Sequence, residues 1–432
     1  MSNSLHNWIN YLSKSKFLRN IVTVATGIAA AQAISLAFMP FLTRLYGPEA
    51  FGALAAFTAI IGIITPLATL GYANAIIMPK TVEGANAVAR LSLISSSIIS
   101  TIALIIIYAF QAHLAPILGL ENQPNLLYLI PISLVLVALL SVANQVAIRE
   151  GLFKAKSTSY VASTFIMNLG KLSAGYISAT GTTLIIFLII SKVINYSMLM
   201  ARVPKVGAFD FRQWFGTKGI KEVAFKYKDF TIYRMPQSIL NAATLGLPVL
   251  LISKFFGASE AGQYSVAVAV LGAPILLLGQ AVGEVFYPKI TRNIESDIKA
   301  ALNLVLKATI SLVIISLLVF SPILFFGADL FKILFGLEWE KAGAYSSWLA
   351  IWMIGTLSSR ACLASLASME LQFYLLYQEV GALILRVLGL YIGFYYFESD
   401  LIAVLLFSLV GFFVNMLLIM FVISKMRERC KN

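Results

Sequence analysis

The chain has 432 residues, of which 59% are hydrophobic and 12% are charged, and its mean hydropathy is +0.88. Soluble domains carry about 25% charged residues, so this composition excludes an ordinary soluble protein and indicates a polytopic, all-α membrane protein. The net charge of +13 lies mostly in loops between apolar runs, so no nucleic-acid partner is expected. His6 and His113 are the only histidines, which argues against a histidine metal site.

Twelve apolar runs are long enough to cross the roughly 30 Å hydrocarbon core of a bilayer. In chain order they are 21–42, 52–78, 91–110, 126–148, 158–178, 182–200, 235–256, 262–286, 303–326, 343–368, 373–397 and 401–424. Lys and Arg gather before the first run, in the even-numbered loops and after the last run. The odd-numbered loops hold Arg44, Lys254, Lys332 and Lys341. By the positive-inside rule both termini are expected to be cytoplasmic.

One polar connector, residues 202–234, separates the first six spans from the last six. We therefore expect an N-terminal lobe at 1–201 and a C-terminal lobe at 235–432. Within the connector, apolar residues follow helical spacing and lysines occupy other positions, the apolar set being Ile220, Val223, Ala224, Tyr227 and Phe230. This pattern predicts an amphipathic helix that lies on the anionic inner leaflet.

The two halves share a short repeat. The segment FLTRLYGPEAFG at 41–52 aligns with LISKFFGASEAG at 251–262, so that Arg44 matches Lys254 and Gly52 matches Gly262. Because six spans separate the copies, they have the same orientation, and the repeat is parallel. Two such lobes around a central cavity are a transporter architecture. A chance match between apolar segments is the alternative.

Four cations lie deep inside predicted spans: Lys171, Lys192, Arg360 and Arg386. A charge at the centre of a membrane helix is unfavourable by about 2.5–3.5 kcal/mol on insertion scales. Such charges are retained when they face a cavity and meet something negative, so a bound or transported anion is expected. If one anion bridges the lobes, the two lysines face the two arginines across the lobe interface. A fifth cation, Lys307, is expected to extend its ammonium to the membrane surface.

Other polar and aromatic residues in the spans are candidates for the same cavity. Thr164, Asn168 and Lys171 form one stripe on a helix, and Asn241 belongs to a similar stripe in the seventh span. Trp352 is a candidate for stacking on a sugar ring. Helix–helix hydrogen bonding is the alternative explanation for each amide and hydroxyl.

Two basic residues near the ends of spans and two acidic residues within spans are predicted to have other roles. Arg44 and Lys254, at matched positions, are candidates for gating or for receiving a phosphate, and simple snorkelling is the alternative. Glu284 and Glu379 are candidates for proton or sodium coupling, or for neutralising a nearby cation. No other cofactor is expected.

The whole chain resembles the polysaccharide-exporter branch of the multidrug/oligosaccharidyl-lipid/polysaccharide (MOP) flippase superfamily, and best the O-antigen flippases of Wzx type. Gln32, Pro40, the turn at 43–52, Pro66 and Gly71 carry this resemblance. It implies two six-helix lobes like those of MATE transporters. It also implies a substrate, an undecaprenyl-diphosphate-linked oligosaccharide, moved from the cytoplasmic to the periplasmic leaflet of the bacterial inner membrane. A polysaccharide polymerase and a chain-length regulator are the expected protein partners.

Two other functions remain open at this point. A cation-coupled multidrug extruder of the same fold would need carboxylates in its cavity, whereas this chain supplies cations. A membrane glycan polymerase or ligase would need large external loops, and the longest here, near 111–125 and 327–342, are too short for a folded domain. We therefore expect a transporter and not an enzyme.

Overall fold

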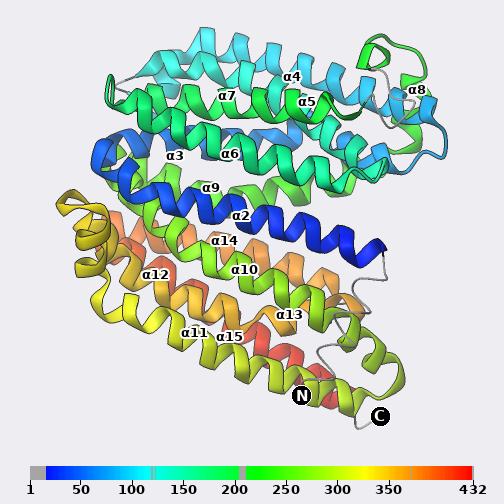
Figure 1. Ribbon diagram of the computed structural model, residues 1–432. Helices are drawn as coiled ribbons and strands as arrows, with labels where there is room; N and C mark the ends of the chain where they lie inside the picture. The colour runs from blue at the N-terminus through cyan, green and yellow to red at the C-terminus, as the bar shows by residue number, and fades with distance from the viewer. Residues whose placement is uncertain (1–15, 118–119, 122, 204–210, 370, 431–432) are drawn as a thin grey trace. The chain divides into compact units, whose positions relative to one another are not determined.

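The computed structural model describes residues 16–117, 120–121, 123–203, 211–369 and 371–430, and within these ranges it is helical with no strand (Figure 1). The α-helices are α2 (Lys16–Leu45), α3 (Pro48–Ala68), α4 (Val82–Ile117), α5 (Leu129–Arg149), α6 (Phe153–Gly175), α7 (Gly181–Met200), α8 (Ile220–Lys226), α9 (Met235–Phe256), α10 (Ala258–Ser296), α11 (Ile298–Phe335), α12 (Glu340–Ser358), α13 (Arg360–Ser368), α14 (Gln372–Tyr395) and α15 (Asp400–Arg429). Short 3₁₀ or π turns are η1 (Tyr72–Ile77), η2 (Pro124–Tyr128), η4 (Phe211–Trp214), η5 (Phe230–Arg234) and η6 (Leu337–Trp339).

Among the described residues, ten helices are long and apolar enough to cross a membrane, and eleven if the bent pair α12–α13 forms one span. The predicted count of twelve is therefore not confirmed. Helix α6 has 23 residues at the place of a predicted span but falls outside this set. Its polar stripe, which includes Asn168 and Lys171, lowers its hydropathy.

Packing divides the helices into two compact units. The first holds the described residues up to Leu45 together with Phe57–Ala243, and the second holds Tyr46–Ala56 and Thr244 onward. Helices α3 and α9 each pass from one unit to the other. These packing units differ from the predicted lobes in two places, because the start of α9 packs with the first unit and the start of α3 packs with the second.

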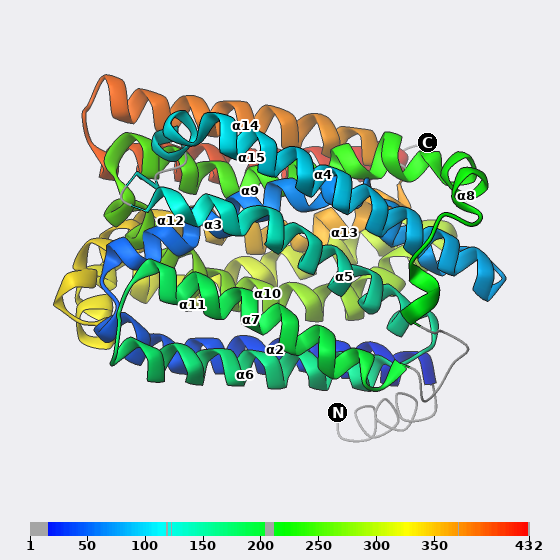
Figure 2. The same cartoon turned by 90° about the horizontal axis from the view of Figure 1, so that it is seen from above.

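In the first unit, α2 lies along α6 over most of its length (Figure 2), and α6 packs on α7. Helices α4 and α5 pack together and against η1. A core of small and branched residues fills the space between them, and Ala85, Val88, Val142 and Val146 in it are completely buried. Small side chains allow the helix backbones to approach closely, as is usual between membrane helices.

The predicted amphipathic helix exists as α8, but its apolar face is covered by protein. Val223 is buried in the first unit's core, and Ile220, Tyr227 and Phe230 pack against the same core. The prediction that this face lies on the inner leaflet is therefore wrong, because helical spacing shows that a face is buried but does not identify what covers it. Hydrogen bonds from Arg90 to the carbonyl oxygens of two connector residues hold the connector against α4.

A single arginine ties the turn between η1 and α4 to the end of α5. The Arg149 guanidinium donates hydrogen bonds to the carbonyl oxygens of Ile76, Pro79 and Thr81 at 3.2, 2.5 and 3.3 Å. Hydrogen bonds to a charged group contribute about 1.5–3 kcal/mol. We expect Arg149→Ala to lower the Tm of the purified protein and Arg149→Lys to restore part of the loss, since an ammonium lacks the planar fork.

The control for this prediction is Lys80→Ala, at an exposed position in the same turn. An Arg149→Ala protein that unfolds at the Tm of the Lys80→Ala protein would show that these three bonds add nothing to stability.

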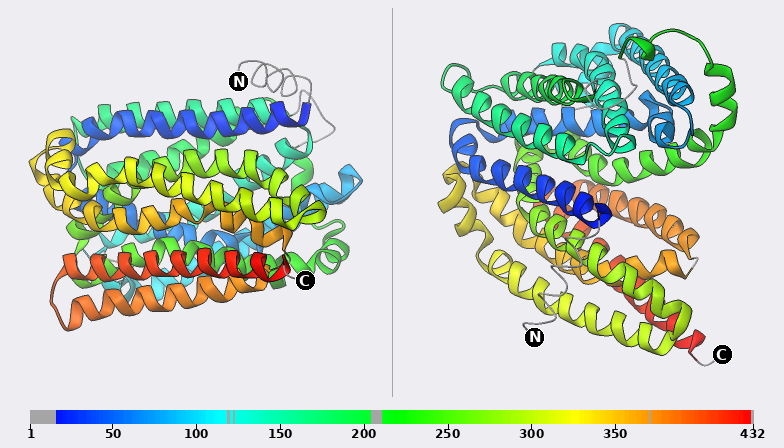
Figure 3. Two further views of the ribbon diagram at one scale, coloured as in Figure 1. Left: turned by 90° about the horizontal axis from the view of Figure 1, so that it is seen from below. Right: turned by 45° about the vertical axis from the view of Figure 1, so that its right-hand side comes forward.

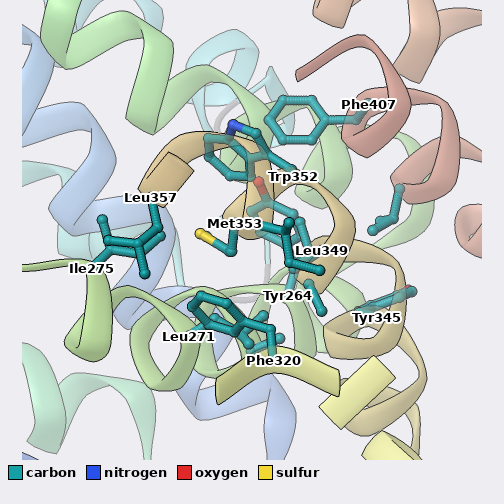
Figure 4. Close-up of a cluster of buried hydrophobic side chains, with 14 of the residues drawn as sticks. Tyr264, Leu271, Ile275, Phe320, Tyr345, Leu349, Trp352, Met353, Leu357 and Phe407 are labelled. Atoms are coloured by element: carbon teal, nitrogen blue, oxygen red, sulfur yellow. The ribbon is translucent and has the colours of Figure 1, made fainter. Parts of the chain in front are cut away.

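In the second unit, α14 and α15 form an antiparallel pair, orange and red in Figure 3, and α12 packs on α10, α11 and α15. The core around α12 is rich in large residues (Figure 4). Tyr264, Phe320, Tyr345 and Phe407 are each at most 2% exposed. This packing fixes α12, which carries part of the site described below.

Two glycines of the predicted repeat meet at one helix crossing within the second unit. A Cβ atom at Gly52 would collide with the backbone carbonyl oxygen of Ala258. A Cβ atom at Gly262 would collide with the carbonyl oxygen of Pro48. Pro48 and Ala258 are also matched by the repeat, so the contact is reciprocal. Only glycine permits this approach of two backbones, and the reciprocity supports the repeat.

Candidate functional site

Arg360 lies at a break in a predicted span. Helix α12 ends at Ser358, and α13 begins at Arg360 with its axis turned by 44°. Discontinuous membrane helices frequently mark binding sites in transporters, because the break frees backbone and side-chain groups to face a cavity. The Nε atom of Arg360 is buried and has no hydrogen-bond partner among the described residues.

Arg386, on α14, is buried with only 6% of its surface exposed. Its guanidinium carbon lies 4.7 Å from the centre of the Trp352 ring and 5.4 Å from that of Phe407. Each contact is a cation–π interaction. The Nε atom of Arg386 also has no hydrogen-bond partner among the described residues. Aromatic rings therefore hold this cation while leaving a donor unused.

Both arginines line one cavity of about 180 Å³ in the second unit. Its other lining residues are Thr244, Trp352, Thr356, Ser359, Leu363, Gln378, Glu379, Ala382, Val414, Asn415 and Leu418. The cavity thus combines two guanidinium groups with one carboxylate, two amides and several hydroxyls. Its local net charge is positive.

No carboxylate forms an ion pair with either arginine within the described part of the chain. Side-chain ion pairs closer than 4.0 Å join Lys332 to Glu340, Lys341 to Glu260 and Asp400, and Lys425 to Glu428. Glu379 lines the same cavity but forms no such pair with Arg360 or Arg386. Glu379 was considered above as a residue that neutralises a nearby cation, but it forms no ion pair with Arg386.

Hydrogen bonds fix the polar wall beside Arg360. The Ser359 hydroxyl donates to Oδ1 of Asn415 at 2.7 Å, and Nδ2 of Asn415 donates to the Gly411 carbonyl at 2.8 Å. On α14, Nε2 of Gln378 donates to the Val414 carbonyl, and Oε1 of Gln378 is buried with no hydrogen-bond partner in the part of the chain that the structure describes. Sequence reasoning missed Ser359 and Asn415, because one hydroxyl or amide in a span is more often a helix–helix contact.

Lys171 and Lys192 lie together in the first unit, on the adjacent helices α6 and α7. Lys171 is 6% exposed, and the two ammonium groups repel each other. Thr164 and Asn168 are buried on the same face of α6, as the stripe predicted, and Nδ2 of Asn168 donates to the Thr164 carbonyl at 2.9 Å. That these lysines face Arg360 and Arg386 stays a prediction.

Three other predicted site residues are exposed. Arg44 and Lys254 are in the last turns of α2 and α9, and Asn241 is near the start of α9. None of the three lines the second-unit cavity. Glu284 belongs to α10, but its side chain lies outside the described residues.

Trp352 holds Arg386 in place. Its ring packs edge-to-face on Phe407 with centroids 5.2 Å apart (Figure 4), and a Cβ atom at Gly411 would collide with it. One side of the indole therefore meets the arginine and another meets the backbone of α15. A sugar contact through the part of the ring that lines the cavity stays a prediction.

The sequence of residues 41–344 matches the family described as polysaccharide biosynthesis protein. The chain belongs to this family. A curated relative is the succinoglycan biosynthesis transport protein ExoT of Rhizobium meliloti (strain 1021), 24% identical over 324 residues. That match covers 72% of this chain and 61% of the relative's length.

Solved structures show the fold of this family member. The inward-facing conformation of a multidrug resistance MATE family transporter of the MOP superfamily gives a TM-score of 0.74 at 14% identity, covering 96% of this chain and 99% of the other. The lipid II flippase MurJ, in an inward closed conformation, gives a TM-score of 0.67 at 11% identity, covering 93% of this chain and 87% of the other. The predicted all-α, MATE-like fold of a multi-pass membrane protein is confirmed.

In this family member the second-unit cavity has the chemistry of an anion site. Guanidinium groups donate charge-assisted hydrogen bonds to phosphate or carboxylate, often two at a time. Amides and hydroxyls in the same wall supply donors and acceptors for polar groups next to the anion. The arrangement suits a ligand that carries both a negative charge and hydroxyl groups.

Proposed function

We propose that this protein is a flippase that carries a lipid-linked polysaccharide precursor across a membrane by alternating access. The observation that carries the proposal is the second-unit cavity, where Arg360 and Arg386 each have a buried donor that no described residue accepts from. A buried and a half-buried cation that form no ion pair among the described residues destabilise a membrane protein, so their presence is best explained by an anionic ligand. Family membership supports the polysaccharide part of the proposal.

The ligand that we infer is an undecaprenyl-diphosphate-linked repeat unit, such as an O-antigen unit. Its diphosphate needs cationic donors to leave water, its sugars need amides and hydroxyls, and its tail remains in lipid. We infer transport from the cytoplasmic to the periplasmic leaflet of the inner membrane, with both termini cytoplasmic. Glu379, in the same cavity, is the candidate for H⁺ or Na⁺ coupling, and a polymerase and a chain-length regulator would act on the product.

The charge of the cavity favours this function over a multidrug extruder. A cavity for cationic drugs would place carboxylates where this one places guanidinium groups, since like charges repel at short range in a low-dielectric site. No covalent step is needed for flipping, so the cavity requires donors and acceptors but no nucleophile or metal.

The two first-unit lysines provide a test in cells that depend on this protein for export. We expect Lys171→Gln and Lys192→Gln each to reduce export about tenfold, since each removes one charged hydrogen bond to the ligand. Lipid-linked glycan extracted from the membrane should accumulate in proportion. The measurement is the amount of glycan released from the lipid by mild acid, at matched protein levels.

Lys307→Gln is the control, because Lys307 is an exposed lysine within the long apolar helix α11. It should leave export unchanged. Normal export in both first-unit variants would contradict the proposed role of these lysines.

A further inference from the structure

A second cavity lies in the first unit and is separate from the cationic one. Its volume is about 490 Å³. It is lined by Asn74, Ile77, Met78, Gln145, Asp229, Phe230, Tyr233 and Arg234. These residues come from η1, α5 and the end of the connector, so three segments distant in sequence meet there.

Unusual backbone geometry lies next to this cavity, where Gly71 approaches the lining residue Phe230. Leu70 has a φ of 48° and Gly71 a φ of 76°, both in the left-handed region, which a leucine rarely adopts. The Thr231 hydroxyl donates to the Leu70 carbonyl at 2.8 Å, so the connector holds this turn in place. Residues 230–234 form a single π turn, a feature that is frequent at functional sites. Strained backbone that is held by a specific contact points to a function for the segment.

The polar groups at this cavity are suited to hydroxyls. Nε2 of Gln145 donates to Oδ1 of Asn74 at 3.1 Å. This bond leaves each amide with further donors and acceptors. Asp229 and Arg234 add one acceptor group and one donor group, and both side chains are exposed. Their opposite charges make this cavity electrically neutral overall, unlike the one in the second unit.

An exposed aromatic ring completes the set. Tyr233 is 70% exposed, so much of its ring is free to contact a ligand. A flat apolar face beside a few convergent polar groups is the usual composition of a small-molecule site, and it matches a sugar ring, which has an apolar face and a polar rim. A free phosphate would find one guanidinium here but also a carboxylate.

We propose that this first-unit cavity binds a sugar ring of the lipid-linked glycan, with Tyr233 against the ring and the Asn74–Gln145 amide pair on its hydroxyls. The inference rests on the proposed function and adds to it a glycan subsite. The anionic and the neutral parts of one substrate would then have separate binding sites, one in each unit.

Photo-crosslinking in cells that make the glycan tests this inference for any glycan that carries vicinal hydroxyl groups. In the full chain, Tyr233→p-benzoylphenylalanine should capture the glycan under ultraviolet light, and the captured protein should react with a periodate-based glycan stain. Mild acid then cleaves the bond between the glycan and the diphosphate. A crosslink to sugar keeps the stain on the protein, whereas a crosslink to the lipid tail loses it.

The expected result is acid-resistant stain at Tyr233 and none at Tyr176→p-benzoylphenylalanine, a control at a tyrosine of the same unit that is 78% exposed. Adding Asn74→Ala and Gln145→Ala should reduce the acid-resistant stain several-fold. Absence of acid-resistant stain at Tyr233, or equal stain at Tyr176, overturns the inference.

Leu363→p-benzoylphenylalanine, in the second-unit cavity, separates this inference from the proposed function. Capture of the lipid-linked glycan at Leu363 without acid-resistant stain at Tyr233 would overturn the glycan subsite and leave the flippase proposal standing. Capture at neither position would count against both.

Discussion

Replacement of Arg386 by glutamine is expected to stop glycan export while leaving the protein folded. The guanidinium would supply charged hydrogen bonds to the transported anion, and loss of one such bond weakens binding by about 1.5–3 kcal/mol, or about tenfold to a hundredfold. Glutamine keeps a polar side chain but lacks the charge and the planar fork. Lipid-linked glycan should therefore accumulate in cells that contain the Arg386→Gln protein.

The same variant should not lose stability. Arg386 is buried, and no carboxylate among the described residues pairs with it. A buried charge without a partner carries a desolvation penalty of several kcal/mol, which a neutral side chain avoids. The cation–π contact with Trp352 offsets this by about 0.5–2 kcal/mol. We expect an unchanged or higher Tm. A Tm well below that of the wild type, with export lost in proportion, would instead assign Arg386 a structural role.

Introducing a methyl group at Gly52 is expected to destabilise the second unit. The new Cβ would meet a backbone carbonyl of α10, which cannot move aside as a flexible side chain can. Overpacking of this kind typically costs about 1–3 kcal/mol, and sometimes more. Gly262→Ala should have a similar effect, because the crossing is reciprocal. The measurement is the Tm and the yield of monodisperse protein.

Gly62→Ala, on the same helix α3, is the matched control. Apart from the adjoining backbone of its own helix, no described heavy atom lies within 4 Å of the position of its Cβ, so the change should be neutral or stabilising by about 0.5–1 kcal/mol. The double variant Gly52→Ala/Gly262→Ala should lose less stability than the sum of the single losses, since one opening of the crossing accommodates both methyl groups. Equal Tm values for Gly52→Ala and Gly62→Ala would contradict the account of this crossing.

The fold was predictable because hydrophobic runs and polar stripes act locally. The stripe on α6 shows this, since spacing alone placed Asn168 and Lys171 on one face, and the structure buries that face. The apolar stripe of α8 also predicted a helix correctly. The surface that covers this stripe depends on tertiary packing, because the sequence pattern does not distinguish a protein core from a membrane surface.

The geometry of the site was harder to predict. Sequence reasoning placed Arg360 within one continuous span at 343–368, whereas the structure breaks that span immediately before it. The Ser358 hydroxyl donates to the Ile354 carbonyl oxygen at 2.7 Å, a contact with the preceding turn that bends helices, and the Ser359 hydroxyl is 3.1 Å from the Thr356 carbonyl oxygen. The Ser-Ser pair is therefore the signal that could have located the break. The helix crossing brings together Gly52 and Gly262, which are 210 positions apart. The sequence repeat showed that these glycines correspond to each other, but it did not show that they are in contact.

The most direct test of the account is the affinity of the purified full-length protein, in lipid nanodiscs, for undecaprenyl diphosphate. The cationic cavity predicts tight binding by the wild type and a loss of about a hundredfold or more in Arg360→Gln/Arg386→Gln, since two charged hydrogen-bonding groups are removed. The Lys307→Gln protein should bind like the wild type. Equal affinities for the wild type and the double arginine variant would contradict the claim that Arg360 and Arg386 bind the anionic part of the substrate.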